Sequence, residues 1–162
     1  MADRDRPLAP RGRRAAERMA SRIAEPDLLP DRILCSPARR TRETLAALLP
    51  RLAGGIDIEI AEDLYDSEEA EYREIICAHR GAADRLLVIG HNPDIQATAV
   101  ALVGSADKRI AAELAAKFPT AALAVIDFDA ETWASLTAGS GRLVAFIRPR
   151  DLDGGDGPAD ED

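Results

Sequence analysis

Two places where a short apolar run leads directly into a helix constrain the fold of this chain most strongly. Residues Arg32 to Cys35 are followed by Ser36-Pro37, and residues Leu86 to Ile89 are followed by Gly90-His91-Asn92-Pro93. A Ser or Asn directly before a proline is typical of a helix N-cap followed by the first helical position. The sequence therefore predicts two buried strands, each of which feeds a helix.

The same alternation of strands and helices continues along the chain. Apolar periodicity predicts helices over residues 11–24, 38–52, 68–80, 93–103 and 108–117, and strands over residues 56–61 and 121–128. A glycine-containing turn at 138–141 joins two further apolar runs, 132–136 and 142–147, which favours an antiparallel hairpin. We therefore expect an α/β fold, with three layers (α/β/α), a mainly parallel sheet and a C-terminal antiparallel hairpin.

Length and composition indicate one domain. The 162 residues suffice for a single core, which we place in residues 1–150, and the acidic, Gly-rich residues 151–162 are predicted to be disordered. The two cysteines, Cys35 and Cys77, are far apart in sequence and are expected to be small core residues.

Charge and hydropathy argue against several classes of partner. A net charge of −8 argues against nucleic acid, because proteins that bind it present a basic face to the phosphates. No apolar run reaches the roughly 20 residues that a membrane span needs. The N-terminal segment from Met1 to Arg14 is rich in charge and lacks the apolar core of a secretory signal. We therefore expect a cytoplasmic protein without membrane contact.

Arg40 and His91 are the candidate functional residues. The strand ends at Ser36 and at Gly90 are expected on one edge of a parallel sheet, and Arg40 lies one turn into the following helix, where its side chain leans back toward that edge. Helix N-termini and a guanidinium together favour an oxyanion, so the pattern predicts a phosphate-binding site. The neighbouring Arg39 and Arg42 are expected to be surface residues.

These residues resemble the motifs of a known family. Residues 36–44, SPARRTRET, match the S-P-x-x-R-x-x-x-T segment of the histidine phosphatase superfamily, and Gly90-His91-Asn92-Pro93 matches its second histidine motif. Weaker matches follow the order found in the SixA-type phosphohistidine phosphatases, namely Arg6-Pro7-Leu8 with Gly12, Leu64-Tyr65, Phe118-Pro119-Thr120 and Trp133. The chain is therefore similar to this branch over nearly its whole length.

The resemblance implies a phosphoglycerate mutase-like fold and hydrolysis of a phosphoryl group through a phosphohistidine intermediate. It assigns phosphate binding and catalysis to Arg40 and His91, and it implies no metal and no cofactor. A general acid would come from Glu62, Asp63 or Asp66, of which we favour Asp66. With phosphohistidine as substrate, the imidazole leaves easily and an acid is less needed. The implied partners are a phosphorylated protein or a small phosphoester.

One element of the family pattern has no counterpart in the sequence. Members of the family open with a strand that ends in Arg-His-Gly or Arg-His-Ala and carries the nucleophilic histidine, whereas the only histidines here are His79 and His91. His79 lies on a predicted helix, its Arg80-Gly81 follow in the wrong order, and its place on an apolar stripe suggests packing. Because the missing strand is internal to the sheet, we expect the natural chain to start further upstream.

Three alternatives stay open from sequence alone. A non-catalytic protein that binds phospho-ligands would keep Arg40 and His91 without hydrolysis. A small-molecule phosphatase or mutase of the same superfamily would share the chemistry but not the substrate. A protein-interaction domain would use the acidic tail instead of the phosphate site. Phosphate binding without turnover would identify the first of these.

Overall fold

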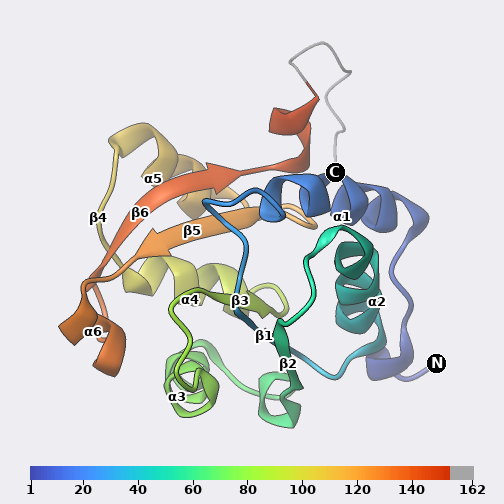
Figure 1. Ribbon diagram of the computed structural model, residues 1–162, viewed down its shortest axis with the longest axis horizontal. Coiled ribbons are helices and arrows are strands. Elements are labelled where there is room, and N and C mark those ends of the chain that lie inside the picture. Colours follow the sequence, from blue (N-terminus) through green and yellow to red (C-terminus); the bar gives the residue numbers. More distant parts are fainter. Residues whose placement is uncertain (154–162) are drawn as a thin grey trace.

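Two three-stranded sheets with helices on both sides form the core of the computed structural model, which describes residues 1–153 (Figure 1). The first sheet is parallel and has the order β2-β1-β3, made of Asp57–Ile60, Arg32–Cys35 and Leu86–Ile89. The second has the order β4-β6-β5, made of Val103–Ser105, Gly141–Ile147 and Leu123–Asp127. Strand β4 is parallel and β5 antiparallel to β6, so the predicted α/β class with a mainly parallel sheet is confirmed.

Helices connect the strands in the predicted order. The α-helices of the described chain are α1 (Pro10–Ile23), α2 (Arg39–Leu48), α3 (Glu69–His79), α4 (Asp94–Leu102), α5 (Lys108–Ala116) and α6 (Ala130–Ser135). The 3-10 helices are η1 (Asp3–Asp5), η2 (Leu49–Arg51), η3 (Glu62–Leu64) and η4 (Pro149–Leu152). None of the described helices is long and apolar enough to cross a bilayer.

The helices cover the two faces of the first sheet separately. On one face, Met19 of α1 and Leu45 of α2 pack with Ile33 and Cys35 of β1. On the other face, Tyr72 of α3 packs with Leu34 of β1. All six side chains are at most 6% exposed. The alternating residues of β1 thus face two helical layers, which is the expected three-layer arrangement.

The helix caps predicted at Ser36 and Asn92 are wrong. Helix α2 begins at Arg39 with Ala38 as its N-cap residue, and α4 begins at Asp94 after a cis Asn92–Pro93 peptide bond. The side chains of Ser36 and Asn92 bind other partners, because the chain makes an additional bend between each strand and its helix. The strand-to-helix order itself is as predicted.

The predicted C-terminal hairpin has a different first strand. Residues 130–135 form α6, because the Asp129 carboxylate caps the Thr132 amide at 3.0 Å and the Trp133 indole donates to the backbone of Ala83 at 2.8 Å. Strand β6 pairs antiparallel with β5 instead, with Leu123 opposite Ile147. An antiparallel pair is therefore present near the C-terminus, with a helix in its connection.

Order extends slightly beyond the predicted end of the domain. Residues Pro149–Leu152 form η4, held by Arg148 and Asp151, and Leu152 packs against the core beside α1. The prediction of disorder is therefore wrong at Asp151 and Leu152, because an arginine and an apolar side chain provide contacts there. The remainder of the predicted tail, from residue 154 onward, lies outside the described residues.

The outer edges of β3 and β5 share their neighbours but form no ladder with each other. Within residues 1–153, β3 ends the first sheet and β5 ends the second. Leu87 and Leu123 pack against one core cluster, while Val88 and Ile126 pack against another. Because successive strand residues point to opposite faces, β3 and β5 have neighbours in common on both faces of the fold. Two unpaired strand edges therefore border the same gap.

Candidate functional site

His91 lies two residues after the end of β3 and pairs with Ser36, the residue that follows β1. Its Nε2 and the Ser36 hydroxyl share a hydrogen bond of 2.5 Å, and Ser36 is fully buried. Parallel strands β1 and β3 end in register, with Cys35 opposite Ile89, so the next residues meet at one edge. The two strand ends predicted to share an edge therefore do so, and they bring a hydroxyl against an imidazole.

A buried tyrosine fixes the backbone at His91. The His91 amide donates to the Tyr72 hydroxyl at 3.2 Å, and Tyr72 is fully buried in α3. A Cβ on Gly90 would lie 2.5 Å from that hydroxyl oxygen, so only glycine fits between β3 and Tyr72. The glycine before the histidine thus allows the close approach that holds the imidazole in place.

The environment of His91 favours a neutral imidazole. Burial, and then the positive charge of Arg40, lower the pKa of His91 below its usual value of 6.5, although Asp3 and Asp94 act in the opposite direction. A neutral histidine beside a guanidinium can take up a proton when an anion binds between them. His91 is thus suited to hold an oxyanion or to exchange a proton with it.

Arg40 lies in the first turn of α2, and its guanidinium faces the N-terminal segment of the chain. Nη1 donates to the backbone oxygen of Asp3 at 3.0 Å, and Nη2 donates to the carboxylate Oδ2 of Asp3 at 3.3 Å. The Arg40 side chain is 23% exposed, whereas the neighbouring Arg39 and Arg42 are on the surface as predicted. Both terminal nitrogens of Arg40 therefore contact one acidic residue.

Tyr65 links the two predicted site residues. Its hydroxyl donates to Oδ2 of Asp3 at 3.0 Å, the same oxygen that Arg40 contacts. Its ring meets the His91 imidazole edge to face, with the ring centroids 5.8 Å apart. Arg40, Tyr65, His91 and the buried Ser36 thus gather at one end of the first sheet.

The three acids considered as proton donors differ in their partners and surroundings. Glu62 pairs with Arg4 at 2.7 Å, and Asp63 lies 3.6 Å from the Nε2 of His79. Asp66 is exposed, and its negative charge helps to raise the pKa of Tyr65. The carboxylate in contact with Arg40 belongs to Asp3, so Asp66 as general acid remains a prediction.

His79, for which the helix position suggested a packing role, makes polar contacts with carboxylates. Its Nδ1 bonds to Glu59 at 2.7 Å, and Glu59 also pairs with Arg32. These residues form an ion-pair network along β1, β2 and α3 and do not contact His91. Among the described residues, no group of three His, Cys, Asp or Glu side chains has the arrangement of a metal site.

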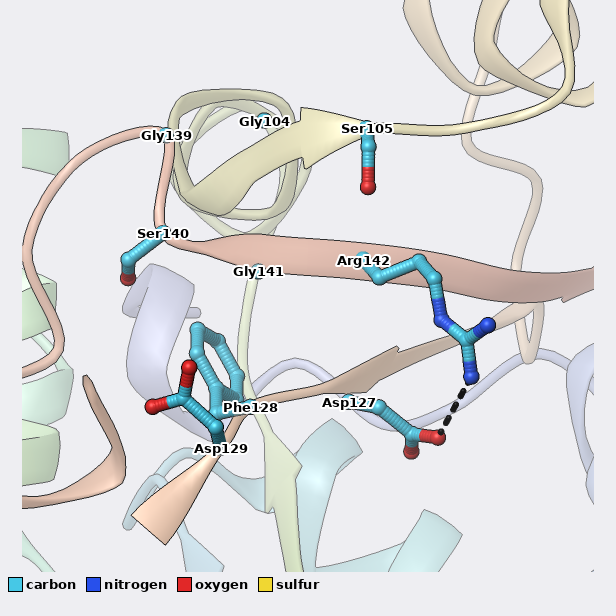
Figure 2. A pocket seen from close by; sticks show the side chains of 9 residues that line it. All are labelled: Gly104, Ser105, Asp127, Phe128, Asp129, Gly139, Ser140, Gly141 and Arg142. Atoms are coloured by element: carbon cyan, nitrogen blue, oxygen red, sulfur yellow. Dashed lines mark ion pairs between the residues drawn. The ribbon is translucent and has the colours of Figure 1, made fainter. Parts of the chain in front are cut away.

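A separate polar hollow of about 540 Å³ lies beside the end of β5 and the start of β6, away from the edge that carries His91 (Figure 2). Asp127, Asp129 and Arg142 line it, and Asp127 pairs with Arg142 at 3.6 Å. Figure 2 shows that the ion pair spans β5 and β6. The only basic side chain there is thus neutralised by an acid, which does not suit a phosphate.

Sequence patterns did not single out Asp3, Ser36 or Tyr72 as parts of the site. Ser36 was interpreted as a helix cap, because Ser-Pro is typical of both situations. Tyr72 lies in a predicted helix, where an apolar ring fits a core position, and it does pack in the core. The steric demand behind Gly90 is the signal that could have pointed to a bulky partner such as Tyr72. For Asp3, the sequence carries no such signal.

One family model and several curated proteins match this chain. A model described as histidine phosphatase superfamily (branch 1) matches residues 2–75. The uncharacterized protein Rv1276c of Mycobacterium tuberculosis is 37% identical over 154 residues, covering 93% of each chain. The uncharacterized protein ML1117 of Mycobacterium leprae is 36% identical over 153 residues, covering 93% of this chain and 91% of that protein.

Solved structures match over the whole domain. A candidate phosphohistidine phosphatase SixA from Agrobacterium tumefaciens has 31% identity and a TM-score of 0.73, covering 92% of this chain and 87% of that one. Its counterpart from Nakamurella multipartitia has 30% identity and a TM-score of 0.76, covering 92% and 88%. A SixA protein histidine phosphatase complexed with tungstate, at 22% identity, TM-score 0.72 and coverage of 93% and 89%, shares the fold.

Proposed function

Since the chain belongs to the histidine phosphatase superfamily and to its SixA-type branch, we propose that it binds and hydrolyses a phosphoryl group at the site formed by Arg40 and His91. Arg40 would hold the equatorial oxygens with its two terminal nitrogens, and His91 would hold or protonate another. Phosphoryl transfer depends mainly on positioning and on positive charge around the transferred group. The reaction would need no metal.

The observation that carries this proposal is the meeting of Ser36, Arg40 and His91 at one edge of the first sheet. The 2.5 Å bond between Ser36 and His91 joins the two segments that resemble the family's motifs, which supports the proposal. A lowered His91 pKa fits a residue that is neutral without ligand and charged beside a phosphate. Of Arg40 and His91, Arg40 is the residue that carries a permanent positive charge.

The nucleophile of this proposal is a histidine on a strand that the 162 residues do not contain. Neither His79, which pairs with Glu59, nor His91 takes that part in our proposal. The gap between β3 and β5 offers two unpaired edges for such a strand, and its C-terminal end would reach the edge where His91 lies.

The substrate we favour is phosphohistidine on a protein. The structures from Agrobacterium tumefaciens and Nakamurella multipartitia carry this activity in their names, and their folds match over most of this chain. An imidazole leaves phosphorus more easily than an alkoxide does, so the exposed Asp66 has little to contribute as an acid with this substrate. A cytoplasmic protein partner is part of the same proposal.

A direct test compares two lengths of the chain. The 162-residue chain and a chain extended by the residues that its gene encodes upstream are assayed with a phosphohistidine protein and with p-nitrophenyl phosphate, both with EDTA. We expect metal-independent turnover by the extended chain only, with preference for phosphohistidine. Inactivity of both chains, or a gene without an upstream Arg-His codon pair in frame, would refute the proposal.

Binding without hydrolysis is the second candidate function, and the absence of a nucleophilic histidine from the sequence favours it. It predicts that the 162-residue chain binds phosphate through Arg40 and that extension adds no turnover. The same two-length assay, accompanied by a phosphate titration, therefore separates the two functions.

A further inference from the structure

The carboxylate of Asp3 is surrounded by the donors of an anion-binding site. Its Oδ2 accepts hydrogen bonds from Arg40 at 3.3 Å and from Tyr65 at 3.0 Å, and its Oδ1 lies 3.4 Å from the guanidinium of Arg6. These donors come from α2, from the loop after η3 and from the segment after η1. Two guanidinium groups and a hydroxyl around one carboxylate form the donor set that binds phosphoryl oxygens.

The contacts of Asp3 engage the part of Arg40 that a phosphate would use. Nη1 of Arg40 binds the Asp3 backbone oxygen and Nη2 binds its carboxylate. A planar guanidinium recognises oxyanions through paired N–H groups, so Arg40 cannot offer this pair to a ligand while Asp3 stays in place. The segment that carries Asp3 thus covers the site.

The segment that carries Asp3 is held by exposed interactions, which a ligand can replace. The Asp3 side chain is 55% exposed, and the adjacent Arg4 holds Glu62 through a pair whose side chains are 45% and 66% exposed. Pairs at such positions are weak, because water solvates both partners well when they separate. A dianion, with twice the charge of a carboxylate, is attracted more strongly by the same guanidinium.

We propose that Asp3 is a built-in competitor of the phosphate site, whose carboxylate occupies the anion-binding side of Arg40 and is displaced by an incoming phosphoryl group. The inference rests on the proposed function and adds regulation to it. Ligands of low charge are kept out by this competition, whereas dianionic phosphoryl groups displace the carboxylate. Release of Asp3 also frees Tyr65 and moves a negative charge away from His91.

The test is a calorimetric titration of inorganic phosphate into the 162-residue chain near neutral pH. The variants Asp3→Asn and Asp3→Ala remove the competing charge, and Ala also removes the side-chain hydrogen bonds. Asp5→Asn is the matched control, because Asp5 lies on the same 3-10 helix and its charge acts on Arg4. Arg40→Ala reports on the site itself.

We expect both Asp3 variants to bind phosphate about fivefold more tightly than the unaltered chain, the gain that loss of one exposed ion pair can give. Asp5→Asn should change the affinity less than twofold on the same scale, and Arg40→Ala should abolish binding. Unchanged or weaker binding by the Asp3 variants, or an equal gain in Asp5→Asn, would overturn the inference.

The outcomes also distinguish this inference from the proposed function. Phosphate binding that needs Arg40 but is indifferent to Asp3 contradicts only the competitor. If neither the unaltered chain nor the Asp3 variants bind phosphate, both the competitor and the proposed function are refuted.

Discussion

At the scale of single residues, Arg40 and its neighbour Arg39 offer a matched comparison. Arg40→Ala should abolish detectable phosphate binding, a loss of at least about tenfold, since a charge-assisted pair of hydrogen bonds to an oxyanion is lost. Arg39→Ala should leave binding unchanged, because Arg39 is on the surface and pairs with Glu43 at 2.8 Å. Calorimetry measures both. Equal losses in the two variants would mean that Arg40 acts only through the general charge of α2.

His91 should report ligand binding through its protonation. Without ligand, its pKa should lie below 6.5, because burial and Arg40 disfavour the charged form. A bound phosphate dianion favours the charged form, so the pKa should rise and proton uptake should accompany binding. NMR titration of the imidazole resonances over pH, with and without phosphate, gives both values. A pKa that phosphate leaves unchanged or lowers would place the anion elsewhere.

At the scale of secondary structure elements, the contact between β3 and α3 positions His91. Gly90→Ala should lower the free energy of unfolding by roughly 1–3 kcal/mol, because the new Cβ would meet the buried Tyr72 hydroxyl at 2.5 Å. Adding Tyr72→Phe removes that hydroxyl, so the double variant should lose less than the sum of the single losses. Urea unfolding of the four proteins measures this. Strictly additive losses would mean that the two residues do not interact.

Periodicity predicted most elements, because each strand and helix had to bury an apolar face. It could not predict where the helices after β1 and β3 begin, since Ser36 and Asn92 use their side chains for contacts with His91 and with the backbone of Phe118. It also missed α6, whose apolar residues suit either a strand or a helix until the cap by Asp129 and the contact of Trp133 with Ala83 decide.

The candidate site was predictable where a motif coincides with a strand end. Arg40 and His91 could be placed at one edge from the parallel topology alone. Asp3 could not, because its contact with Arg40 spans 37 positions in sequence and depends on the path of η1. Long-range contacts between exposed polar side chains leave no periodic pattern.

At the scale of the whole molecule, the gap between the two sheets should limit stability. A chain extended upstream by a strand that pairs with β3 and β5 should gain several hydrogen bonds and bury the partly exposed Leu87 and Val88. Its midpoint of thermal unfolding should therefore rise by at least about 5 °C. An extension of equal length made of Gly and Ser is the control. No rise beyond this control would argue against a strand in the gap.

We propose above all that Arg40 and His91 form a phosphate site in this chain, and the two histidines make this directly testable. Inorganic phosphate is titrated into the 162-residue protein while the imidazole resonances of His91 and His79 are followed by NMR. We predict a saturable shift of His91 that Arg40→Ala abolishes, with His79 unaffected because it pairs with Glu59 in a separate network. Equal shifts of both histidines, or no shift of His91, would contradict the account.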